Sequence, residues 1–112
     1  MDKLCDVLDK TPLRIEIISP DATTIRLALT GDLDFDTAGE LASILPADGC
    51  DRVDIDLSGL AFIDSSGLAA LVRLHQALAG SGTTLHVVAL TPYLRSLMRM
   101  TALDRLFSLP PV

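Results

Sequence analysis

"VDIDLSGLAFIDSSGLAAL", residues 53–71, changes its hydrophobic spacing halfway along. Val53, Ile55 and Leu57 alternate with polar residues, a pattern typical of a strand with one buried face. After Asp64 the apolar residues recur at helical spacing, which predicts a helix over about 65–79. A strand that passes straight into a helix predicts an α/β fold.

The same two spacings place the other elements. Alternating or continuous apolar residues predict four strands, at 13–19, 23–30, 52–60 and 83–90. The last of these is almost wholly apolar, which predicts a central strand covered on both faces. Helical spacing predicts three helices, one within the segment 31–45 that begins after Asp36, one over about 65–79 and one at 91–102. Asp36 is the expected N-cap of the first helix, and Thr91 followed by Pro92 is expected to begin the third.

This order predicts one α/β domain with a mixed sheet of four to five strands and helices packed on it. We expect the domain to span residues 13–112 and to follow a leader at 1–12. The chain is 49% hydrophobic, so it can build a core.

The charge and the cysteines exclude several classes of protein. The net charge is −6 and the nine Lys and Arg are scattered, which argues against nucleic-acid binding and for a basic protein partner. Cys5 and Cys50 have no metal-site or disulfide-framework spacing. No signal peptide is visible, and no apolar run reaches the about 18 residues of a membrane span. A cytoplasmic location without a membrane span is the expectation.

Neither a metal site nor a cofactor site is predicted. Asp32, Asp34 and Asp36 alternate, but Thr37 and Ser43 stand where a helix–loop–helix calcium site needs a glycine and a bidentate acid. A helix cap within an acidic surface loop explains these acids better. No phosphate-binding or dinucleotide-binding glycine motif occurs.

The serines also lack the context of a catalytic nucleophile. No G-x-S-x-G motif is present. The only histidines, His75 and His86, lie in an apolar helix stripe and in an apolar strand, where a structural role is expected. We therefore predict that the protein is not an enzyme and has no catalytic residue.

A different role is open to Ser65 and Ser66. Asp64 can cap the helix, which places both serines and Gly67 in the first turn, near free N–H groups and the positive end of the helix dipole. A phosphate there would add a charge of about −1.5 to −2 without breaking the fold. The chemistry thus permits a switch that acts on binding alone.

The helix face opposite the leucine stripe carries small side chains. It consists of Ser66, Ala69, Ala70, Arg73 and Ala77. These side chains would let a partner protein approach closely, but they also suit a plain helix of good propensity. Spacing alone leaves both interpretations open.

Three blocks resemble the STAS domain family, in particular bacterial anti-sigma factor antagonists: "GDLDFDTAGEL", "VDIDLSGLAFIDSSGLAALVRLHQAL" and "LDRLF". The resemblance covers about residues 13–109. It implies a protein that binds an anti-sigma factor and thereby releases a sigma factor. It also implies that the anti-sigma factor is a serine kinase that phosphorylates the antagonist and that a serine phosphatase restores the binding form.

The family's phosphorylated residue directly follows the aspartate, so the resemblance points to Ser65. A helical wheel instead puts Ser66 on the outer face, and Ser66 remains the second choice. The predicted switch and partner-binding residues are Asp34, Asp64, Ser66, Gly67, Ala69, Ala70 and Arg73. The alternative is a STAS scaffold subunit without a sigma partner, for example in lipid transport or stress signalling. The intact hydroxyl of "DSSG" favours the antagonist.

Overall fold

The computed structural model of the chain describes residues 11–44, 50–107 and 109–111. Its elements are β1 (Arg14–Ile18), β2 (Thr24–Leu33), α2 (Ala38–Ala42), β3 (Arg52–Ile63), α3 (Ser65–Gly80), β4 (Thr84–Ala89), α4 (Pro92–Met100) and the 3-10 helix η1 (Leu103–Arg105). Most of the leader expected at 1–12 lies outside the described residues.

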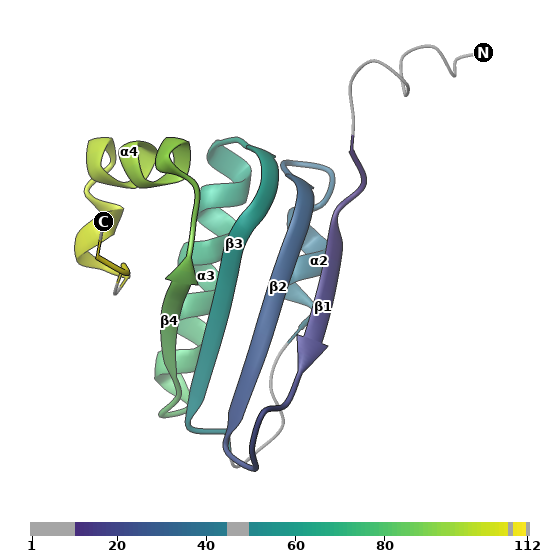
Figure 1. Cartoon of the computed structure of the whole chain (residues 1–112), viewed down its shortest axis with the longest axis vertical. Helices are drawn as coiled ribbons and strands as arrows, with labels where there is room; N and C mark the ends of the chain where they lie inside the picture. Colours follow the sequence, from purple (N-terminus) through teal and green to yellow (C-terminus); the bar gives the residue numbers. More distant parts are fainter. Residues whose placement is uncertain (1–10, 45–49, 108, 112) are drawn as a thin grey trace.

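The four strands form one mixed sheet whose order, β1-β2-β3-β4, follows the chain. β1 runs antiparallel to β2, whereas β2, β3 and β4 are parallel (Figure 1). Helices α2 and α3 lie behind the sheet in this view, and α4 lies beyond the end of β4. This arrangement confirms the predicted mixed α/β fold, with four strands in the sheet.

The hydrophobic core lies between the sheet and α3. Alternate residues in the middle of β2 and in the first half of β3, such as Leu27 and Ile55, are buried in the core. On α3 the leucine stripe expected from helical spacing, including Leu71, Leu74 and Leu78, is buried as well. Burial of these side chains is the main source of stability, because each buried leucine or isoleucine contributes about 1.5–3 kcal/mol.

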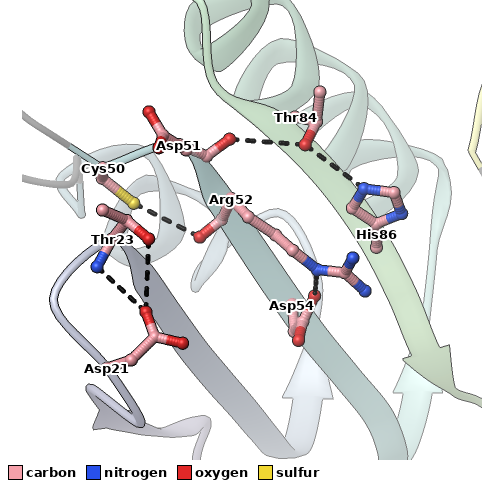
Figure 2. Close-up of polar contacts among 8 residues, drawn as sticks. All are labelled: Asp21, Thr23, Cys50, Asp51, Arg52, Asp54, Thr84 and His86. Atoms are coloured by element: carbon pink, nitrogen blue, oxygen red, sulfur yellow. Dashed lines mark hydrogen bonds and ion pairs between the residues drawn. The ribbon is translucent and has the colours of Figure 1, made fainter.

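The opposite face of the sheet is polar. The Nε of Arg52 lies 2.6 Å from Oδ1 of Asp54, and the guanidinium of Arg26 lies 3.7 Å from Oδ2 of Asp56. Figure 2 shows the first of these pairs beside Thr84 and His86 on β4. Such partly exposed pairs contribute little individually, but their alternation with the core residues fixes which face of each strand is buried.

Two expectations about the elements are wrong. The segment 83–90 does not give a central strand, because β4 is at the edge of the sheet. The apolar run includes the half-buried Val88 and Ala89 at the end of β4 and continues into Leu90, where the chain leaves the sheet for α4. The start expected for the helix within 31–45 is also wrong. Gly31–Leu33 complete β2, and α2 begins after Thr37, so Asp36 is not its N-cap. Pro46 lies outside the described residues.

The two longer helices begin where the sequence predicts. α3 starts directly after Asp64, and α4 starts at Pro92 after Thr91, whose Oγ1 accepts a hydrogen bond of 3.1 Å from the Leu94 N–H. These caps satisfy backbone N–H groups that the helix itself leaves unpaired.

Candidate functional site

Asp34, Asp64, Ser65, Ser66 and Gly67, from the set of predicted switch residues, lie at one end of the sheet, whereas Ala69, Ala70 and Arg73 lie further along α3. The carboxyl ends of the parallel strands β2 and β3 meet at the upper end of the sheet in Figure 1. The turn 34–37 follows β2 there, and Asp64 and Ser65 follow β3. In open α/β sheets this edge is the usual place for a functional site.

Asp64 connects the two strand ends. Its Oδ1 accepts a hydrogen bond of 2.9 Å from the Gly67 N–H, which makes it the N-cap of α3. Its Oδ2 accepts a second bond of 3.2 Å from the Phe35 N–H in the turn after β2. The backbone N–H of Asp64 also donates to the Leu33 carbonyl at 3.3 Å. One carboxylate therefore holds the start of the helix and the neighbouring turn together.

Asp34 shapes that neighbouring turn. Its side chain is only 6% exposed, and Oδ1 accepts hydrogen bonds from the N–H groups of Asp36 and Thr37, at 3.1 and 3.2 Å. This is the geometry of an aspartate that stabilises a turn. Asp34 thus stabilises the turn that carries Phe35, whose N–H donates to Asp64.

The alternating acids serve separate structural purposes. Asp32 is buried and its Oδ2 accepts a bond of 3.1 Å from the Thr11 N–H, while Asp36 is exposed. Within residues 11–44, 50–107 and 109–111, no three His, Cys, Asp or Glu side chains gather in a way that could hold a metal ion.

Gly67 is buried at the closest approach of α3 to β2. A Cβ atom at this position would clash with the carbonyl oxygen of Leu33 and would lie 2.8 Å from Cγ1 of Ile63. A glycine lets the first turn of the helix pack directly on the strand end. Gly67 is therefore buried beneath the candidate site. The expectation that it belongs to the contact surface is wrong.

The two serines differ in exposure. Ser65 is exposed and Ser66 is half-buried. The helical wheel, which puts Ser66 outermost, is therefore wrong at this boundary. Ser65 is the first residue of α3 and follows the extended residue Asp64, so full helical geometry does not yet apply to it.

The small-residue face is divided between the core and the surface. Ala70 is only 1% exposed and belongs to the same core cluster as Ala38 and Leu41 of α2, so its expected outward orientation is wrong. Helix α2 packs against α3, and Ala70 is part of the core that the two helices and the sheet enclose. Ala69 is half-buried, and Arg73 is exposed.

The histidines are not placed to activate Ser65. His75 follows Ser65 by ten residues in the same helix, about 15 Å along the axis. Its ring stacks edge-on against Phe107 with centroids 5.7 Å apart, and its Nδ1 is buried without a hydrogen-bond partner in the described part of the chain. His86 lies on β4 and bonds Thr84 Oγ1 through Nε2 at 3.2 Å.

Sequence reasoning missed the aromatic residues of the site. Phe35, in the turn after β2, is 78% exposed, and Phe62, near the end of β3, is 46% exposed. The available signal was a phenylalanine between acids in "DLDFD", a segment assigned to a helix and its cap. Large exposed apolar side chains beside a polar site indicate an interaction surface.

In the part of the chain that the structure describes, no helix is both long and apolar enough to cross a membrane.

A family model described as "Mlab, STAS domain" matches residues 18–110. Among solved structures, an anti-sigma factor antagonist from Mycobacterium paratuberculosis is 28% identical, with a TM-score of 0.75 over 90% of this chain and 87% of that one. The unphosphorylated anti-sigma factor antagonist SpoIIAA is 18% identical, with a TM-score of 0.71 over 88% and 89% of the two chains.

A sulfate transporter family protein from Wolinella succinogenes is similar too, at 17% identity and a TM-score of 0.67 over 79% of this chain and 80% of that one. The last two similarities concern the fold alone. The fold is thus shared by proteins of different roles.

Proposed function

This chain belongs to the STAS domain family, and from that premise we propose that it is an anti-sigma factor antagonist of the cytoplasm. In this proposal it binds an anti-sigma factor of the serine-kinase type and so releases the sigma factor that the anti-sigma factor holds. Phosphorylation of Ser65 switches the binding off, and a serine phosphatase restores it. The protein itself is the substrate of these enzymes and performs no catalysis.

The observation that carries the proposal is the exposure of Ser65 at the start of α3. A kinase needs to reach the hydroxyl, and the exposed first residue of a helix permits this. The cap by Asp64 does not involve the Ser65 side chain, so a phosphate on Ser65 leaves the hydrogen bonds of Asp64 available. The positive end of the helix dipole tolerates the added negative charge.

The phosphate acts on the partner because of what it adds to the surface. It brings a charge of about −1.5 to −2 next to the carboxylate of Asp64. A partner that packs closely over Ser65 would then have to desolvate this charge. Because that is costly, the partner dissociates. The similarity of the fold to that of the antagonist from Mycobacterium paratuberculosis, over 90% of this chain, supports this role.

The second candidate function is that of a STAS scaffold subunit without a sigma partner. The match to a model described as Mlab favours it. A scaffold has no need for a phosphorylatable hydroxyl, so the state of Ser65 separates the two.

The test is incubation of the protein with a panel of kinase-type anti-sigma factors and ATP, followed by mass spectrometry of the peptide that contains Ser65. We expect one phosphate on wild type and on Ser66→Ala, and none on Ser65→Ala. Ser65→Asp should keep its fold by circular dichroism and lose affinity for the partner, whereas Ser65→Ala should bind constitutively.

Ser96→Asp is the matched control, since Ser96 is an exposed serine of another helix and its charge should leave binding unchanged. Phosphate on neither Ser65 nor Ser66 with any kinase would refute the antagonist and favour the scaffold. Phosphate on Ser66 alone would assign the switch to Ser66 instead of Ser65.

A further inference from the structure

Strand β1 lies at an edge of the sheet, at the right in Figure 1. In the part of the chain that the structure describes, it pairs with β2 alone. Its outer row of backbone N–H and C=O groups is therefore available to a further strand. Natural edge strands usually prevent such pairing with a bulge, a proline or charged side chains.

The β1 edge has little of this protection. Its register on β2 is continuous over Arg14–Ile18, without the shifts that interrupt the register of β2 with β3 and of β3 with β4. No proline lies within the strand. Ile17 and Ile18 are 57% and 51% exposed, although isoleucine is among the residues most often buried. β1 is thus a regular and partly apolar edge of the kind that pairs with another chain.

The two faces of β1 differ in character. Ile15 and Ile17 pair with buried leucines of β2, so they lie on the face of the sheet that carries the core. Arg14 and Glu16 alternate with them, so they lie on the polar face, and both are exposed. One cation and one anion therefore stand two residues apart on the same face of this edge.

These two charges make β1 complementary to a second copy of itself. A two-fold axis perpendicular to the sheet at Ile15 pairs the two strands antiparallel and places Arg14 of each copy opposite Glu16 of the other. On the core face, the two copies of Ile15 then meet, and Ile17 lies opposite Leu13. An axis at Arg14 or at Glu16 would instead place like charges opposite each other. Charge therefore favours the register centred on Ile15.

We propose that β1 is a self-association surface, through which two copies of this chain join their sheets edge to edge in the register centred on Ile15. Each copy has a net charge of −6, which opposes association at low salt. At physiological ionic strength the Debye length is about 8 Å, so the repulsion between distant charges is screened more than the contact between Arg14 and Glu16. Because the contact is only one strand wide, the dimer is in reversible exchange with the monomer.

The experiment is analytical ultracentrifugation of the whole chain over a series of concentrations, at an ionic strength of about 0.15 M. A reducing agent prevents Cys5 and Cys50 from linking copies through disulfides. Wild type should form a dimer. Arg14→Glu and Glu16→Arg each place like charges opposite each other at two points, so each should raise the dimer Kd by about tenfold or more. The double variant, which carries both substitutions, should restore the wild-type Kd because opposite charges face each other again.

Glu40→Arg is the matched control for Glu16→Arg. It makes the same change in net charge, but at an exposed residue of α2 instead of on β1. It should leave the dimer Kd close to that of wild type. Amide hydrogen exchange gives the location: the amides of β1 should become better protected as the concentration rises, whereas those of the other edge strand, β4, should not.

Three results would overturn the proposal. The first is a wild-type chain that is still monomeric at about 1 mM. The second is a dimer whose Kd both single charge reversals leave unchanged, and the third is a double variant that dimerises no better than the single variants. The phosphorylation test of Ser65 is independent of all three, so the function proposed above and this self-association stand or fall separately.

Discussion

Gly67 shows how one atom can determine the geometry of the site. Its position against the Leu33 carbonyl leaves no room for a Cβ, and a backbone carbonyl cannot turn aside as a side chain can. We expect Gly67→Ala to lower the free energy of unfolding by about 1–3 kcal/mol, as other overpacked sites do. Urea denaturation followed by circular dichroism measures the change.

Gly80→Ala is the matched control for this prediction. Gly80 also belongs to α3, but a Cβ there meets nothing within 4 Å. We expect it to be neutral or to stabilise by about 0.5–1 kcal/mol, because alanine suits a helix better than glycine. Equal effects of the two substitutions would contradict the close approach at Gly67.

Asp56, on the polar face of the sheet, makes the free energy of unfolding depend on pH in the acidic range. Burial acts to raise its pKa, but hydrogen bonds from the Ser58 hydroxyl and N–H, together with the charge of Arg26, outweigh burial and hold the pKa below its usual value of 3.8. A carboxyl with a lowered pKa stabilises the fold above the unfolded-state value, and this contribution is lost as the pH falls through the folded-state pKa.

The test compares wild type with Asp56→Asn in urea at a series of pH values. The difference in unfolding free energy should be constant near neutral pH and should shrink below about pH 3.8. Ser58→Ala removes one donor, at 2.6 Å from Oδ1 of Asp56, and should weaken this pH dependence. A difference that grows in acid would have the wrong sign.

At the scale of elements, Asp64 joins α3 to the turn after β2 through two oxygens. Asp64→Ala removes both hydrogen bonds, and we expect a loss of about 1–3 kcal/mol in unfolding free energy. Asp64→Asn retains one oxygen that can cap Gly67, but its amide cannot also accept from the Phe35 N–H. Its loss should be smaller.

Amide hydrogen exchange separates these two contacts. In Asp64→Asn the Phe35 amide should exchange faster than in wild type while the Gly67 amide stays protected. Thr91→Ala, which removes the cap of α4, is the control: it should destabilise by about 1 kcal/mol and leave both amides unchanged. Faster exchange of Gly67 alone would contradict the assignment of the two oxygens.

Local signals predicted the elements that depend on local physics. The α3 and α4 starts follow from Asp64 and from Thr91 with Pro92, because caps act within one turn. The division of 31–45 into a strand end, a turn and a short helix depends on Leu33, which is buried by neighbours distant in sequence. The edge position of β4 and the burial of Ala70 also arise from tertiary packing, which periodicity does not report.

At the scale of the whole molecule, β2 and β3 are the strands with a neighbour on each side. Their central amides, in 27–29 and 53–57, should therefore exchange most slowly, and those of β1 and β4 faster. Native-state hydrogen exchange measured by NMR tests this order. Slower exchange in β4 than in β3 would contradict its place at the edge.

The strand order has a consequence for synthesis. Each strand after β1 pairs with the strand directly before it in the chain. Each new strand therefore finds a partner that has already been synthesised. As the polypeptide leaves the ribosome from its N-terminus, the β1–β2 hairpin can close first, and β3 with α3 and then β4 can add to it in turn. Cell-free translation stalled at successive lengths, with limited proteolysis of the ribosome-bound chains, should show protection growing strand by strand.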